Sequence, residues 1–406
     1  MQPDRAAALA ALRWVLGGEP VDLATFWGGF EALPPHLRPL AASHALRHLA
    51  GLDTDARQRL LAMERAAAVA YMARHAAVTS MRTALDAANS PAVFLKGIAL
   101  AEQVYPSPAT RTMSDIDVWL RAEDLPMAVS ALMEAGLTSP DRHTNPTALS
   151  GPDPDAYLEA TVAGGVVFIE AHTRPASFRD LGDQEVAALW SSTVPAGPTA
   201  LPVLSLDAQL LHVCLHTTRA HGCVAGLKSL VDVAMIVRGW PSDALWEAFT
   251  ARVMRVGAAG AVYVSLELAR EELGVGVPGR VLDRLRVPGS RAILDVAADL
   301  LWSPPPRLPV GTPRLLGAEG EPGWLRNRLL LRRNLTAEER QQLAPAERPD
   351  PRLVIRYFGN RIIALAALLA RGELLRPSFW RRVAVHRRGF TWMRELSRIE
   401  SQRGPP

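Results

Sequence analysis

The spacing of hydrophobic and polar residues changes twice along the chain, and these changes predict where helices give way to strands. Residues 3–89 are rich in Ala, Leu and Arg, which predicts helices. Asp53 is a typical N-cap residue, and we expect a long helix from there to about Ala88. Apolar residues then recur with a period of two, which predicts strands over 93–95 and 116–120 and a hairpin over 157–172.

The rest of the pattern completes the expected architecture. Residues 123–135 read as an amphipathic helix ended by a glycine, and Leu204-Ser205-Leu206-Asp207 begins a helical stretch that runs to about Trp302. Loops or linkers are expected over 140–155 and 303–322, and an apolar-faced helix over 353–369. We therefore expect an α+β fold in which a small mixed sheet, with helices on one side, lies between helical regions. The expected divisions are 1–90, 91–200, 201–302 and 303–406.

Two carboxylates stand out in the strand predicted over 116–120. Asp115 and Asp117 alternate with apolar residues, and residues i and i+2 of a strand share a face about 6–7 Å apart. Two such carboxylates repel each other unless a cation lies between them, and hard oxygen ligands suit Mg²⁺. The alternative is an exposed strand face that carries two solvated acids.

A lysine and a glycine mark the turn upstream of this pair. Lys96-Gly97 follows a short buried strand and precedes a helical pattern, and backbone amides at a helix N-terminus attract anions. Lys96 and Lys228 are the only lysines, against 43 arginines, which favours a specific role for a lysine in this turn. The pattern therefore indicates a site that holds both metal and phosphate.

These residues resemble a known group of enzymes. Leu95-Lys96-Gly97, the run YPSPATRTMSDIDVWL, and the later FIEAHTRP and LLHVCLHTTRAHG are similar to a bacterial family of uncharacterised nucleotidyltransferases. Gly97 followed at a distance by Asp-x-Asp on a strand also resembles the nucleotidyltransferase superfamily typified by DNA polymerase beta. The resemblance covers roughly Pro91 to Gly239, and the 18 positions from Gly97 to Asp115 exceed the usual spacing of that superfamily.

The resemblance implies roles for named residues. Asp115 and Asp117 would bind two Mg²⁺ ions, with Mn²⁺ as an alternative, and Glu170 would complete the metal set or act as the base. The Gly164-Gly165 turn that feeds the strand of Glu170 supports this assignment. The residues expected to contact the NTP are Lys96, Gly97, Arg111, Ser114 and Lys228.

Three further residues have either a substrate-binding or a structural role in this interpretation: His172, His216 and Asp232. His172 shares a strand face with Glu170, so it would orient that carboxylate or touch the acceptor. His212 and His216 have the spacing of a zinc-protease helix, but Val213 replaces the glutamate that such a site needs. Zinc is therefore not expected.

Composition narrows the class of protein. The 406 residues suggest two or three domains, and no apolar run reaches the ~20 residues that span a bilayer. We see no signal peptide, and two cysteines read as reduced core thiols, so a cytoplasmic location is expected. Residues 323–406 hold 18 Arg against 7 acids, which suggests an acidic or phosphorylated partner or, alternatively, solvated helix faces.

The function expected from these features is metal-dependent transfer of a nucleoside monophosphate from an NTP, with ATP as the first choice. The acceptor is an unidentified hydroxyl or phosphate, with peptide natural products and small molecules as candidates suggested by the resemblance. A catalytically silent scaffold and an RNA-directed terminal nucleotide adder are the alternatives. The sequence shows no aromatic-interleaved basic strand that would favour RNA.

Overall fold

The computed structural model of the chain describes residues 3–138, 155–162, 165–224, 226–240 and 242–303, together with residues 384, 388, 391, 392 and 396. The predicted linker over 303–322, the helix over 353–369 and the basic region beyond residue 323 lie almost entirely outside these residues. Within the described part no helix is long and apolar enough to span a membrane.

An N-terminal group of helices precedes the sheet. These elements are α1 (Pro3–Val15), α2 (Leu23–Ala32), η1 (Pro35–Leu37), α3 (Arg38–His48) and α4 (Thr54–Ala87). The predicted long helix is confirmed as α4. Asp53 caps its N-terminus, since the Asp53 carboxylate accepts a hydrogen bond of 2.7 Å from the backbone N–H of Ala56.

Strands and helices alternate in the next part of the chain. The strands are β1 (Ala92–Leu95), β2 (Asp115–Leu120), β3 (Asp155–Val162), β4 (Gly165–His172), β5 (Thr193–Ala196) and β6 (Leu201–Leu204). The helices between them are α5 (Lys96–Gln103), η2 (Pro108–Thr110), α6 (Leu125–Glu134), η4 (Ala176–Phe178) and α7 (Asp183–Ser191). The strands predicted over 93–95, 116–120 and 157–172 are therefore confirmed, whereas β5 and β6 were not predicted.

Helices make up the remainder of the described chain. They are α8 (Leu206–Leu215), the π-helical turn η5 (His216–Ala220), α9 (Leu227–Arg238), α10 (Asp243–Arg255), α11 (Ala259–Leu273), α12 (Gly279–Leu285) and α13 (Ser290–Leu301). Cys214 and Cys223 are buried and unlinked, as reduced core thiols should be.

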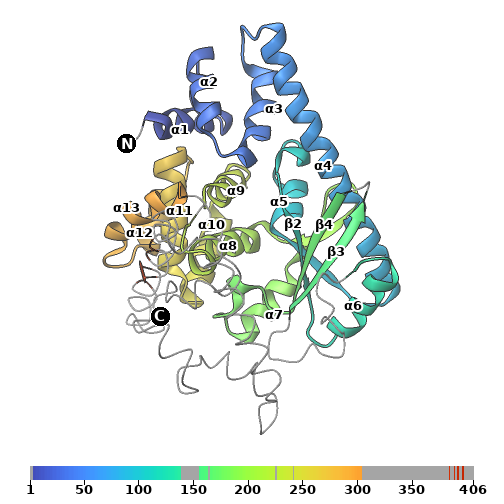
Figure 1. Ribbon diagram of the computed structural model, residues 1–406. Helices are drawn as coiled ribbons and strands as arrows, with labels where there is room; N and C mark the ends of the chain where they lie inside the picture. Colours follow the sequence, from blue (N-terminus) through green and yellow to red (C-terminus); the bar gives the residue numbers. More distant parts are fainter. Residues whose placement is uncertain are drawn as a thin grey trace, which may run out of the picture.

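The six strands form one mixed sheet in the order β3-β4-β2-β1-β6-β5. Strand β2 runs antiparallel to β1 and parallel to β4, and β2 and β1 are the two innermost strands of the sheet. Figure 1 shows α4 and α6 beside one face of the sheet and the helices from α8 onward gathered on the other side.

Helices cover both faces of the sheet, and the expectation of helices on one side is wrong. On one face Phe94, Ile116 and Val118 pack into a core with residues of α4 and α6. On the other face Val93, Leu95 and Trp119 join the core of the helical regions. Alternating side chains of β1 and β2 thus enter two separate cores, since successive residues of a strand point to opposite faces. The Asp115 and Asp117 side chains belong to the face that meets the helical regions.

Candidate active site

Asp117 and Glu170 lie side by side on neighbouring strands. They are register partners on the parallel strands β2 and β4, while Asp115 is paired with Phe168 one step along the same face. The predicted placement of Glu170 on a strand adjacent to the Asp-x-Asp pair is confirmed. Among the described residues, Asp117, Glu170 and His172 each offer one ligand atom, and these atoms lie within 4.8 Å of one another. Asp115 is not a member of this close group.

Lys96 supplies the nearest cation to the acidic group. Its Nζ donates to Asp117 Oδ1 at 2.6 Å, so the ammonium touches a carboxylate in this structure. The chain changes from β1 to α5 at Lys96, whose φ of 45° lies in the left-handed region that residues other than glycine rarely adopt. Such a conformation costs about 1–3 kcal/mol and is concentrated at functional sites.

Gly97 has a packing role at the same junction. A Cβ at position 97 would lie 3.0 Å from Cβ of Met113, in the segment that leads into β2. Glycine at this position therefore allows α5 to approach the entrance to the acidic strand. A contact between Gly97 and NTP phosphates stays a prediction.

His172 Nε2 faces both carboxylates. It lies 3.2 Å from Asp117 Oδ1 and 3.5 Å from Glu170 Oε2, and the residue is only 8% exposed. Burial by itself would raise the pKa of Asp117, but the Lys96 ammonium and the hydrogen bonds from His172 and Lys96 hold that pKa well below its usual range. Burial and the charge of Asp117 raise the pKa of Glu170. The two paired carboxylates therefore differ in proton affinity, with Glu170 the stronger base.

Ser114 and Lys228 lie around this centre. The Ser114 hydroxyl donates to Asp115 Oδ1 at 3.1 Å. Burial lowers the pKa of Lys228 to about 8, and Arg111 adds to this effect while Asp232, Asp115 and Asp117 oppose it. Lys228 therefore lies within the electrostatic reach of the acidic strand, although it belongs to α9.

Arg111 does not face open space as a free phosphate clamp. Its Nε and Nη2 donate to Asp232 Oδ1 and Oδ2, both at 2.6 Å, and the two side chains are 6% and 3% exposed. The Tyr105 hydroxyl also donates to Asp232 Oδ1, at 2.7 Å. The Arg111 guanidinium would have to leave this buried pair to bind a triphosphate. In this structure Asp232 joins α9 to the loop that leads into β2.

The histidines of α8 and η5 contact each other and neighbouring polar side chains. His212 Nδ1 lies 2.7 Å from the Ser177 hydroxyl, and burial lowers the pKa of His212 to about 3. The ring of His216 stacks on that of His212 with centroids 6.0 Å apart, and His216 Nε2 lies 3.1 Å from His221 Nε2. These contacts give His212 and His216 structural partners within the described chain.

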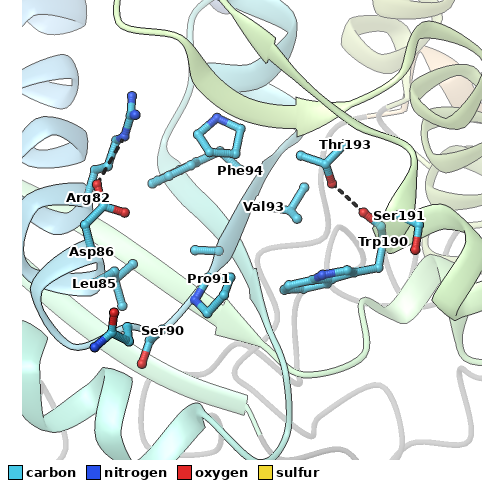
Figure 2. Close-up of a pocket in the computed structure, with 13 residues that line it drawn as sticks. Arg82, Leu85, Asp86, Ser90, Pro91, Val93, Phe94, Trp190, Ser191 and Thr193 are labelled. Atoms are coloured by element: carbon cyan, nitrogen blue, oxygen red, sulfur yellow. Dashed lines mark hydrogen bonds and ion pairs between the residues drawn. The ribbon is translucent and has the colours of Figure 1, made fainter.

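A surface cavity of about 560 Å³ lies elsewhere on the molecule. Figure 2 shows Arg82 and Asp86 on one wall, Trp190 and Thr193 on the other, and Val93 of β1 between them. None of the predicted site residues lines it. The candidate active site is thus defined by converging charged side chains at β2 and β4 rather than by this cavity.

The arrangement defines a class of enzyme. Adjacent carboxylates of unequal basicity, with a lysine at a strand-to-helix junction, are suited to binding a divalent cation and a phosphorylated substrate. The family described as uncharacterised nucleotidyltransferases matches residues 35–274, more than half of the chain, and the protein belongs to that family. It is a transferase of the nucleotidyl-transfer class. The match begins before and ends after the segment in which the resemblance was expected.

Two other comparisons gave no match: no curated protein and no solved structure matches the chain. The identification therefore rests on the family match. Sequence reasoning missed Tyr105, which contacts Asp232, although Tyr105 opens the motif that carried the resemblance. It also left open whether His172 belongs to the acidic group, which the structure places beside Asp117.

Proposed function

We propose that the protein transfers a nucleoside monophosphate from an NTP, with ATP as the first donor to test, to an acceptor hydroxyl or phosphate. The observation that carries this proposal is the pairing of Asp117 with Glu170 on adjacent parallel strands, next to Asp115 and Lys96. In the reaction an acceptor oxygen forms a bond to the α-phosphorus, the bond from that phosphorus to the pyrophosphate oxygen breaks, and pyrophosphate leaves.

The side-chain oxygens of the acidic group suit a divalent cation as ligands. Asp117 and Glu170 provide oxygen ligands within 4.8 Å of each other, and both are at least partly removed from water. The residues proposed to hold the metal are Asp115, Asp117 and Glu170. When bound, Mg²⁺ neutralises charge on the phosphates and stabilises the attacking and leaving oxygens.

The alternative role proposed for Glu170 is that of the base for an acceptor hydroxyl. Burial and the neighbouring Asp117 raise the pKa of Glu170, so its carboxylate binds a proton more strongly than an exposed glutamate does. The proton lost by the acceptor hydroxyl passes to this carboxylate as the new phosphorus–oxygen bond forms. Asp117, whose pKa is held low, stays ionised throughout.

Lys96 and Lys228 are the proposed phosphate-neutralising residues. Lys96 Nζ donates a hydrogen bond to Asp117 Oδ1, so it lies near any cation or phosphate bound at that carboxylate. Lys228 of α9 interacts electrostatically with Asp115 and Asp117. We propose that NTP binds between β2 and α9, with its phosphates between the two ammonium groups. Ser114, beside Asp115, would contact the same phosphates. Arg111 would contribute long-range positive charge from its pair with Asp232.

The test is transfer of label from NTP. Each of the four NTPs, labelled at the α-phosphate, is incubated with the protein, Mg²⁺ or Mn²⁺ and a cell extract, with Asp117→Asn as the matched control. The proposal predicts that wild-type protein moves label from one NTP to a new product and releases pyrophosphate. Identical label distributions for the wild type and Asp117→Asn with every NTP would overturn it.

A further inference from the structure

We propose that His172 is a direct ligand of the divalent cation, so that the site combines two carboxylates with one imidazole and prefers Mn²⁺ to Mg²⁺. This inference rests on the proposed function, since it concerns the cation of the same reaction. The inference adds a nitrogen ligand to a site that the sequence indicated as purely carboxylate. The class of cation is then a divalent first-row transition-metal ion that accepts both oxygen and nitrogen ligands.

The distances around His172 Nε2 carry the proposal. Adjacent ligand atoms of an octahedral ion with bonds of 2.0–2.1 Å lie about 3 Å apart. His172 Nε2 lies 3.2 Å from Asp117 Oδ1 and 3.5 Å from Glu170 Oε2, which is close to this spacing on both sides. The contact with Asp117 is within hydrogen-bond distance, but the Glu170 oxygen lies only slightly farther from the same nitrogen. Here a single ring nitrogen approaches oxygens from two strands.

The strands hold this geometry in place. Glu170 and His172 are residues i and i+2 of β4, so both point to the face that carries Asp117 on β2. His172 is register partner of Trp119, a buried residue whose Nε1 donates 2.9 Å to the Thr173 carbonyl, next to His172 in the chain. The backbone that carries His172 is therefore fixed against the backbone that carries Asp117.

Charge at the site supports a cation in this position. Asp117 Oδ1 accepts a hydrogen bond from the Lys96 ammonium at 2.6 Å and lies 3.2 Å from His172 Nε2, so a cation and a ring nitrogen share one carboxylate oxygen. Glu170 Oε2 lies 3.5 Å from the same ring nitrogen, so carboxylates of two adjacent strands share this imidazole. A divalent ion bound by Asp117, Glu170 and the unprotonated Nε2 of His172 would place positive charge between the two acids, of which only Asp117 has a lysine partner among the described residues.

The mixed ligand set favours a transition-metal ion over Mg²⁺. Mg²⁺ binds hard oxygen ligands and holds its waters strongly, whereas imidazole suits transition metals. Mn²⁺ accepts carboxylates and imidazole and keeps octahedral coordination. Replacing His172 by Gln would offer an amide oxygen in place of the nitrogen and should remove the preference for Mn²⁺ with little effect on Mg²⁺.

The experiment measures Mn²⁺ and Mg²⁺ affinities of the full-length protein by calorimetry, without NTP. Four proteins are compared: wild type, His172→Gln, Asp117→Asn and the control His75→Gln. His75 is a matched control because it also lies near a carboxylate, with Nε2 3.9 Å from Glu102 Oε1 on α5, but away from the acidic group. His172→Gln should weaken Mn²⁺ binding by about tenfold or more and Mg²⁺ binding by less than about threefold.

The outcomes separate this inference from the proposed function. Loss of both ions in Asp117→Asn together with an unchanged Mn²⁺ to Mg²⁺ ratio in His172→Gln would overturn the role of His172 and leave the metal site in place. Unchanged binding of both ions in Asp117→Asn would overturn the metal site itself. His75→Gln should match the wild type.

A spectroscopic measurement on the wild type tests the proposal even if the His172 variant does not fold. Pulsed electron paramagnetic resonance of bound Mn²⁺ should show magnetic coupling to one directly bound ¹⁴N nucleus. Bound Mn²⁺ without such coupling would overturn the proposal irrespective of the variants.

Discussion

Asp117 and Glu170 are register partners on the parallel strands β2 and β4, and Lys96 binds the Asp117 carboxylate at 2.6 Å. The two acids therefore share a face but have different partners. The Lys96 ammonium holds the pKa of Asp117 low, whereas burial and the charge of Asp117 raise the pKa of Glu170. This difference between neighbouring carboxylates suits Asp117 to hold a cation and leaves Glu170 either to bind the same cation or to accept a proton.

The first prediction concerns the Asp-x-Asp pair. Asp115→Asn and Asp117→Asn should each lower turnover by about two orders of magnitude or more, because each removes a ligand from the metal that stabilises the reacting oxygens. Their melting temperatures should differ. Asp115→Asn should melt like the wild type, whereas Asp117→Asn should melt lower, because it loses the ion pair with Lys96. Near-normal turnover in either variant would remove that residue from the metal site.

The second prediction concerns Glu170. Its folded-state pKa is raised above the ordinary value of 4.5, so the ionised carboxylate costs stability at neutral pH. This cost disappears as the pH falls below 4.5, where the side chain is protonated in the folded and unfolded states alike. With chelator present, Glu170→Gln should melt at or above the wild type at pH 7, and the difference in melting temperature should shrink on acidification. In a separate assay with Mg²⁺ or Mn²⁺, Glu170→Gln should lose transfer activity. A large drop in melting temperature at pH 7 would assign Glu170 a stabilising role instead.

The third prediction concerns Lys96. Without metal, Lys96→Ala leaves a buried Asp117 carboxylate unpaired, so the melting temperature should fall, and Mn²⁺ or Mg²⁺ should restore it by replacing the ammonium. If Lys96 also stabilises charge that develops in the transition state, kcat and kcat/KM should fall together. Lys96→Arg should retain part of the activity, since it keeps the positive charge. Normal steady-state kinetics for Lys96→Ala would restrict Lys96 to a structural role.

The fourth prediction concerns the buried pair between Arg111 and Asp232. Removing one partner strands the other charge away from water, so Arg111→Met or Asp232→Leu alone should cost about 3–5 kcal/mol in unfolding free energy. The double variant should cost clearly less than the sum of the two, because neither charge remains. Denaturant unfolding of the four proteins measures the coupling. Additive losses would mean that the two side chains act independently.

Much of the sheet could be predicted because its central strands follow a clear period of two. Residues 116–120 and 157–172 alternate apolar and polar side chains, and a Gly-Gly turn marks the hairpin. Strands β5 and β6 escaped prediction because each has four residues and includes a proline, Pro195 or Pro202, which lowers strand propensity. Because they were missed, the full width of the sheet was not foreseen.

The acidic site was more predictable than its support. The i, i+2 spacing of Asp115 and Asp117 is local, and the hairpin that carries Glu170 predicted an adjacent strand. The Arg111–Asp232 pair joins residues 121 positions apart, and no local pattern predicts which buried cation meets which buried carboxylate. The expected contact of Arg111 with the NTP was limited in the same way, since the partner of Arg111 is set by how α9 packs against the loop before β2.

The most direct test of the central claim, which is metal-dependent nucleotide binding at Asp117, measures the binding of a non-hydrolysable NTP analogue by calorimetry. Wild type and Asp117→Asn are each titrated with the analogue, once in the presence of Mn²⁺ or Mg²⁺ and once in the presence of EDTA. No acceptor is needed. The account predicts binding by the wild type that is at least about tenfold weaker in EDTA, and loss of this metal effect in Asp117→Asn. Equal binding of the analogue by the wild type with metal and with EDTA, or no binding in either, would contradict it.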